Sequence, residues 1–172
     1  SLLLFALLPR RTLWLAAAIA VLGILYSHPA LSAKSIPIVC SGPHLLGGLL
    51  HFLLGYSLFD PIDGRGVLIA LFFALTFTAG HLNQEVCDYE GDRLNGLRTN
   101  AVTFGKTGTF LAGLVVFTLA YADVALLAYS GVVPRLLGVL PLLFYPVHVA
   151  WSVSTLRAGL SFKAGDSASA KQ

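Results

Sequence analysis

The chain has 172 residues, of which 56% are hydrophobic and 11% are charged, and its formal net charge is +3. A soluble domain of this size carries about twice that charged fraction, so the composition excludes an ordinary soluble domain and indicates a helical integral membrane protein. It also excludes a nucleic-acid-binding protein, because no stretch is rich in Lys and Arg.

Five apolar segments approach the ~20 residues that a membrane-spanning helix needs. In chain order they cover residues 13–26, 36–59, 67–87, 110–129 and 133–153. A shorter apolar run, residues 2–8, has no basic segment before it and so does not resemble a signal peptide. We interpret it as the end of a helix that begins upstream.

The sequence therefore predicts an all-α, polytopic transmembrane helical bundle with about five complete spans and a partial N-terminal helix. The bundle covers residues 1–158, which we expect to be a fragment of a larger helical domain. Residues 159–172 form a polar tail that we expect to be flexible.

The direction of the spans alternates along the chain, which places residues 27–35, residues 89–109 and the tail on one side of the membrane. Seven of the eleven Lys and Arg residues lie on that side, so the positive-inside rule predicts that it is cytoplasmic. If the protein is bacterial, the membrane is the inner or plasma membrane. Lys34 then faces the same compartment as the loop at 89–109.

Half of the eight acidic residues lie in eight consecutive positions, as Glu85, Asp88, Glu90 and Asp92. Carboxylates are costly beside a membrane core, so such a cluster usually has a functional role. If the third helix continues to about Leu94 and stops at Asn95-Gly96, then Glu85, Asp88 and Asp92 lie on one helical face. Three stacked carboxylates favour a hard divalent cation, most simply Mg²⁺.

The alternative for this cluster is a solvated helix end, in which Asp88 and Asp92 form salt bridges with Arg93 or Arg98. The spacing of the acids, their position at the membrane edge and Lys34 on the same side favour a cation site instead. Glu90 points away from the shared face and is the weaker candidate.

A longer pattern continues from Asp88 and Asp92, which form a DxxxD pair. It consists of Gly96, then Arg98-Thr99, then Phe104-Gly105. The stretch resembles the second aspartate-rich motif of the UbiA superfamily of intramembrane prenyltransferases. Glu85 extends the pair to ExxDxxxD, a variant of the family's longer DxxDxxxD form.

A second match lies upstream, where Tyr26-Ser27-His28-Pro29 is followed by Lys34. It is similar to the YSxPP…K loop of that superfamily. Taken separately, Tyr26 would be an interfacial aromatic residue and Lys34 a lysine of the positive side. Their distance before an acidic motif favours the functional interpretation.

The superfamily's first aspartate-rich motif, NDxxDxxxD, does not occur in the chain. Asp60 and Asp63 form a DxxD, but it follows the Tyr/Lys loop and faces the opposite side. We interpret it as a turn in which Pro61 and Gly64 supply the bend. The resemblance therefore covers the central and C-terminal helices of a domain with about nine helices.

The resemblance implies Mg²⁺-dependent transfer of a prenyl group from an isoprenyl diphosphate to a hydrophobic acceptor. It implies that Asp88 and Asp92 bind the metal with support from Glu85, and that Lys34, Arg98 and Arg93 balance the diphosphate charge. Tyr26 would stabilise the allylic cation with its ring or orient the diphosphate with its hydroxyl. An aromatic quinone precursor is the first candidate acceptor, and a lipid or chlorophyll-type alcohol is the second. No protein partner is evident.

Three other functions are compatible with parts of the pattern. A non-catalytic homologue or assembly subunit would lack the first motif, and a terpene cyclase of the same superfamily would need no acceptor. A transporter would place its acids at the bilayer midplane. The acids here lie at a helix end beside a basic loop, which disfavours the transporter.

The apolar segments also contain isolated polar residues. We expect Asp123 to be partnered by Tyr121 or His148 within the bundle. His44 and His51 share one face of the second span, where a structural role is favoured over lining the cavity. His81 lies one turn before Glu85 and is expected near the site. Close helix packing in the second span is expected at Gly42, Gly47 and Gly48.

Overall fold

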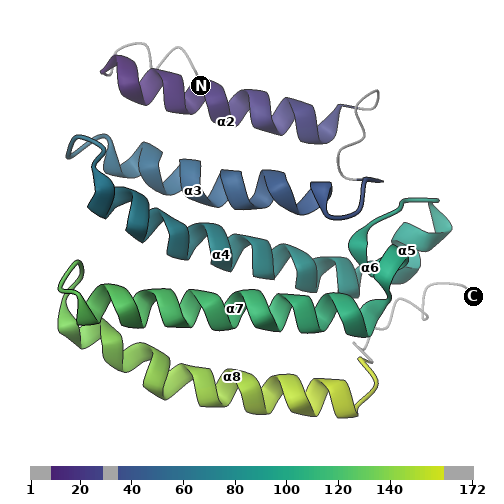
Figure 1. The fold of residues 1–172 in the computed structure, drawn as a ribbon. Coiled ribbons are helices and arrows are strands. Elements are labelled where there is room, and N and C mark those ends of the chain that lie inside the picture. The colour runs from purple at the N-terminus through teal and green to yellow at the C-terminus, as the bar shows by residue number, and fades with distance from the viewer. Residues whose placement is uncertain (1–8, 29–34, 161–172) are drawn as a thin grey trace, which may run out of the picture.

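The computed structural model describes residues 9–28 and 35–160 (Figure 1). Three predictions fall outside the described residues: the partial N-terminal helix, Lys34, and nearly all of the polar tail. Within the described residues, all regular secondary structure is helical. This confirms the predicted all-α class.

Five helices make up the bundle: α2 (Arg10–Ser27), α3 (Gly42–Tyr56), α4 (Gly64–Cys87), α7 (Lys106–Tyr129) and α8 (Val139–Arg157). Figure 1 shows them side by side in chain order, and each packs against its neighbour in the sequence. Four short helices join them: η2 (Val39–Ser41), α5 (Tyr89–Leu94), α6 (Asn100–Phe104) and η3 (Arg135–Gly138).

Each predicted span overlaps one of the five helices. Among the described residues, four helical stretches are long and apolar enough to cross a membrane: Arg10–Ser27, Gly64–Cys87, Lys106–Tyr129 and Arg135–Arg157. The second predicted span contains a shorter helix, because η2 precedes α3 and α3 has 15 residues. The chain is thus an integral membrane protein.

The contact between α3 and α4 depends on Gly48. A Cβ atom at this position would lie 2.8 Å from the Cα atom of Ala74 and 2.8 Å from the carbonyl oxygen of Phe73. The prediction of close packing is confirmed at Gly48. It is wrong at Gly42, where a Cβ atom would meet none of the described residues within 4 Å. At Gly47 the described neighbour of such an atom is Leu22, at 4.0 Å.

The third span does not continue to Leu94 as one helix, and that prediction is wrong. α4 ends at Cys87, Asp88 has φ −85° and ψ 1°, and α5 begins at Tyr89. The break turns Tyr89 toward a cluster of buried apolar side chains that includes Val86 and Phe110. Burial of this aromatic ring favours the turn over a continuous helix. The predicted stop is confirmed at the end of α5, where Gly96 has φ +68°.

The ends of the helices bring the two predicted motifs together. The C-terminal end of α2, the start of α3, and the short helices α5 and α6 all lie at one end of the bundle (Figure 1). The opposite end carries the turn between α3 and α4, where the Asp63 carboxylate accepts a hydrogen bond from the Gly66 amide at 2.8 Å. Asp63 therefore caps α4, as expected for a residue in a turn.

Candidate functional site

A cavity of about 260 Å³ lies at the end of the bundle where α2, α4 and α5 meet. Its lining includes six side chains from the predicted motifs and their surroundings: Tyr26, His44, His81, Glu85, Asp88 and Asp92. The fold therefore gathers the aromatic residue of the first motif and the acids of the second around one space. The acids share this space although α4 ends at Cys87 and α5 begins only after Asp88.

The two aspartates of the DxxxD pair are held differently. Asp88 is exposed at the junction of α4 and α5, and its Oδ2 accepts a hydrogen bond from Gln84 Nε2 at 3.0 Å. Asp92 lies on α5 and is half-buried. Both side chains line the cavity, so their carboxylates can act on the same ligand.

The acidic segment is fixed to the start of α7 by Lys106. The Lys106 Nζ atom lies 3.3 Å from Glu90 Oε1 and 4.7 Å from the centre of the Tyr89 ring. Tyr89 packs against the apolar cluster on its other side. These contacts hold α5 against the start of α7. Glu90 therefore pairs with Lys106 outside the cavity, as expected for the weaker candidate.

The two arginines of the second motif do not line this cavity. Arg93 Nε lies 3.4 Å from Glu90 Oε2, and both side chains are exposed. Arg98 is exposed in the connection between α5 and α6. Arg93 thus pairs with Glu90.

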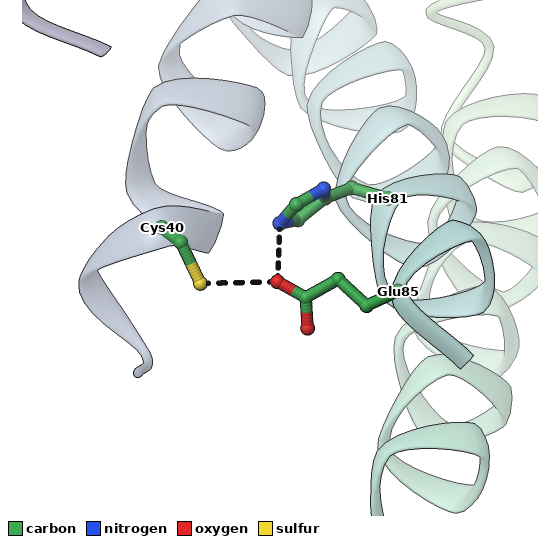
Figure 2. A group of neighbouring side chains, drawn as sticks. All are labelled: Cys40, His81 and Glu85. Atoms are coloured by element: carbon green, nitrogen blue, oxygen red, sulfur yellow. Dashed lines mark hydrogen bonds and ion pairs between the residues drawn. The ribbon is translucent and has the colours of Figure 1, made fainter. Parts of the chain in front are cut away.

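Glu85 lines the same cavity as the two aspartates, but side chains outside the DxxxD pair contact its carboxylate. It is 4% exposed, and its Oε1 lies 3.1 Å from His81 Nε2 and 3.2 Å from Cys40 Sγ (Figure 2). Its second oxygen, Oε2, is buried and has no hydrogen-bond partner in the described part of the chain. His81 therefore lies beside the acidic motif, as predicted, and only Oε2 of Glu85 is left for a ligand of the aspartates.

Tyr26 reaches the cavity from the last turn of α2. Its ring meets the His44 ring edge-on, with 5.1 Å between centroids, and the His44 ring stacks on His81 at 3.6 Å. Three helices, α2, α3 and α4, are thus joined by aromatic contacts beside the acids. This arrangement fixes one face of Tyr26 and leaves its ring at the cavity wall.

The model of one protein family matches the chain over residues 1–167, that of the UbiA prenyltransferase family. The chain belongs to the UbiA prenyltransferase family. Membership supports a membrane prenyltransferase function in general, in agreement with the resemblance of the two motifs. No curated protein and no solved structure matches the chain significantly.

The site of this UbiA family member contains two residues that the sequence analysis did not single out. Cys40 contacts Glu85, and Asn100 Nδ2 donates hydrogen bonds to Cys40 Sγ and Ser41 Oγ, each at 3.1 Å. Asn100 directly follows Arg98-Thr99, and this position beside the motif is the sequence feature that could have marked it as a site residue. Its partners are 59 or more positions away in sequence, which hides the contact.

The prediction that Tyr121 or His148 is the hydrogen-bond partner of Asp123 is wrong. Tyr121 Oη and His148 Nδ1 lie 3.5 Å apart and contact each other, whereas Asp123 Oδ2 is buried without a hydrogen-bond partner among the described residues. His44 lines the acidic cavity, although a structural role was favoured. His51 contacts the Gly47 carbonyl oxygen at 2.7 Å within its own helix.

Proposed function

We propose that the protein transfers a prenyl group from an isoprenyl diphosphate to a hydrophobic acceptor within the membrane, in a Mg²⁺-dependent reaction. The observation that carries this proposal is the cavity shared by Asp88, Asp92 and Tyr26 at one end of the helices. An aromatic quinone precursor is the first candidate acceptor. A lipid or chlorophyll-type alcohol is the second.

The donor set of the cavity fits magnesium. Asp88 and Asp92 offer the hard oxygen ligands that Mg²⁺ prefers, and the unpartnered Oε2 of Glu85 can support them. A bound Mg²⁺ ion would neutralise diphosphate charge and make departure of the leaving group easier. Gln84 restrains Asp88 by hydrogen bonding, which keeps one carboxylate oriented before substrate binds.

Basic residues are proposed to complete the neutralisation of the diphosphate. Lys34 and Arg98 belong to the two family motifs and carry this role in the proposal. Arg93 is a weaker candidate, because it pairs with Glu90 at 3.4 Å. Fixed positive charge of this kind stabilises the departing anion without reorganisation of solvent.

The prenyl chain is proposed to lie in the apolar cavity next to the acidic one. This second cavity has a volume of about 210 Å³, and its lining is mostly apolar and includes Ile19, Leu22 and Phe77. It shares Tyr26 and His44 with the acidic cavity. Tyr26 would thus stand where the diphosphate meets the prenyl chain, which suits an allylic cation against its ring or a diphosphate at its hydroxyl.

Substitution of the two aspartates tests the proposal. In the full-length protein, Asp88→Ala and Asp92→Ala should each lower kcat by about 10²-fold or more, because each removes a charge that stabilises the leaving group. Mg²⁺-dependent prenyl transfer to a panel of aromatic and alcohol acceptors is the measurement. Asp60→Ala, at the opposite end of the bundle, is the control and should keep wild-type turnover. Unchanged turnover in both motif variants, with normal membrane insertion, would overturn the assignment.

A further inference from the structure

A compact group of side chains at the wall of the acidic cavity includes two residues, Cys40 and His81, that the proposed function does not use. Cys40 comes from η2, and His81 and Glu85 come from α4, one turn apart (Figure 2). The Sγ, Nε2 and carboxylate oxygen atoms all lie within 4.8 Å of one another. Cys40 is fully buried, and the side chains of His81 and Glu85 are 8% and 5% exposed.

The hydrogen bonding of this group is incomplete. Cys40 Sγ donates to Glu85 Oε1 at 3.2 Å, whereas His81 Nε2 lies 3.1 Å from the same oxygen without hydrogen-bond geometry. Glu85 Oε2 is also buried without a partner in the described chain. A buried carboxylate is costly unless positive charge compensates it, and its ion-pair neighbour among the described residues is His81 alone.

We propose that Cys40, His81 and Glu85 bind a divalent ion of the zinc class at a site separate from Asp88 and Asp92. Thiolate, imidazole and carboxylate are together the ligands of Zn²⁺ and its neighbours, whereas Mg²⁺ selects oxygen ligands. The ion would supply positive charge beside Glu85, because His81 binds a metal as the neutral imidazole. Binding converts the Cys40 thiol to a thiolate and releases its proton to solvent.

Neighbouring groups already orient these ligands. Asn100 Nδ2 donates to Cys40 Sγ at 3.1 Å, which stabilises negative charge on the sulfur. The His44 ring lies parallel to the His81 ring, with an interplanar angle of 5°, and His44 Nδ1 contacts the Cys40 carbonyl oxygen at 3.1 Å. Such outer contacts fix ligand geometry at metal sites.

Three protein ligands leave at least one coordination position of a tetrahedral ion open. His81 and Glu85 both line the acidic cavity, so that position would face the space shared with Asp88 and Asp92. The two sites would then hold ions of different chemistry in one cavity. Metal binding by Cys40, His81 and Glu85 can be measured without a prenyl donor, so its failure is distinguishable from a failure of prenyl transfer.

Cobalt titration of the purified full-length protein tests the site without an activity measurement. After removal of any affinity tag, Co²⁺ should bind with a stoichiometry of one and give a near-ultraviolet thiolate-to-cobalt charge-transfer band. Added Zn²⁺ should abolish the band, and millimolar Mg²⁺ should leave it unchanged. Absence of a charge-transfer band in the wild-type protein overturns the proposal and leaves a purely hydrogen-bonded cluster.

Variants assign the ligands. Cys40→Ser should remove the band, whereas Cys87→Ser should keep it, because Cys87 is an exposed cysteine at the end of α4. Glu85→Gln preserves side-chain volume and should weaken Co²⁺ binding, and Asn100→Ala should weaken it about 10–100-fold. Asp88→Ala should bind Co²⁺ as the wild type does. A band that survives Cys40→Ser in a folded protein, or that is lost in Cys87→Ser, contradicts the assignment.

Discussion

At the scale of single residues, Asn100 joins two segments that are distant in sequence. Its Oδ1 accepts a hydrogen bond from the Ile38 amide at 2.6 Å, while its Nδ2 donates to Cys40 and Ser41. Ile38 has φ +67°, which is strained for a β-branched residue and requires support from its surroundings. Asn100 thus holds the start of the second span against the acidic motif.

Truncation of this side chain should destabilise the protein. Asn100→Ala leaves the Ile38 amide without its partner, and we expect the free energy of unfolding to fall by about 1–3 kcal/mol. Asn95→Ala, which removes an exposed contact to Gly91, is the matched control and should have a smaller effect. Equilibrium unfolding in detergent measures both. Equal losses for the two variants would contradict the role given to Asn100.

At the scale of the elements, helix α4 organises the site because it contacts α3 on one side and α7 on the other. Gly48 allows the close approach of α3 and α4, and Asp63 caps the N-terminus of α4. The last turns of α4 then deliver His81 and Glu85 to the cavity. Changes at the far end of α4 or in its contact with α3 are therefore expected to be transmitted to the site.

A methyl group at Gly48 tests the contact between α3 and α4. Gly48→Ala would place a Cβ atom 2.8 Å from the Ala74 backbone, and we expect destabilisation by about 1–3 kcal/mol from overpacking. Gly55→Ala lies in the same helix, where a Cβ atom meets nothing within 4 Å. It should be neutral or stabilising by up to about 1 kcal/mol. The measurement is thermal unfolding of both variants. A Gly48→Ala protein as stable as the wild type would exclude tight packing of α3 against α4 at this position.

The cap at the start of α4 predicts a pH dependence. The hydrogen bond from the Gly66 amide holds the pKa of Asp63 below its ordinary value of 3.8. The charged carboxylate therefore contributes stability that is complete above pH 3.8 and is lost as the pH falls through the lower pKa of the folded state. Thermal unfolding of Asp63→Asn should show less of this acid-dependent loss than the wild type. Asp60→Asn, an exposed neighbour, should retain it in full.

At the scale of the whole molecule, the row of helices assembles one cavity from residues that lie between positions 26 and 99 of the sequence. α2, α4 and α5 each contribute to its wall. Because no single helix contains the site, a ligand that binds there must tie several elements together. Substrate binding should accordingly raise the free energy of unfolding of the whole bundle.

Ligand-dependent thermal stability measures this coupling. Mg²⁺ together with an isoprenyl diphosphate at about 100 times its Kd should raise the free energy of unfolding by about 2.7 kcal/mol. Chelation of the metal should reverse most of the gain, because the negatively charged carboxylates would then repel the diphosphate. Asp88→Ala and Asp92→Ala should show little gain. An equal rise in Tm without Mg²⁺, or in both variants, would show that the ligand binds elsewhere.

Features that depend on residues close together in the sequence were predicted correctly. The lengths of the apolar runs predicted the helices, the DxxxD spacing placed Asp88 and Asp92 at one cavity, and Gly96 marked the end of a helix. The single helix to Leu94 was wrong, because burial of Tyr89 against α7 outweighs helix continuity. Apart from Val86, the members of that cluster lie further along the chain, at Ala101, Phe110, Leu156 and Leu160.

Hydropathy and motif spacing are properties of consecutive residues, so they alone predict a helical membrane protein with an acidic motif of the UbiA prenyltransferase family. Only the tertiary structure decided which side chains meet. Cys40 and Glu85 are 45 positions apart, and Cys40 and Asn100 are 60 apart. Their contacts depend on how η2, α4 and α6 pack against one another. Helix packing places Asp88, Asp92 and Glu85 around one cavity, and it also brings Glu85 into contact with Cys40 and His81.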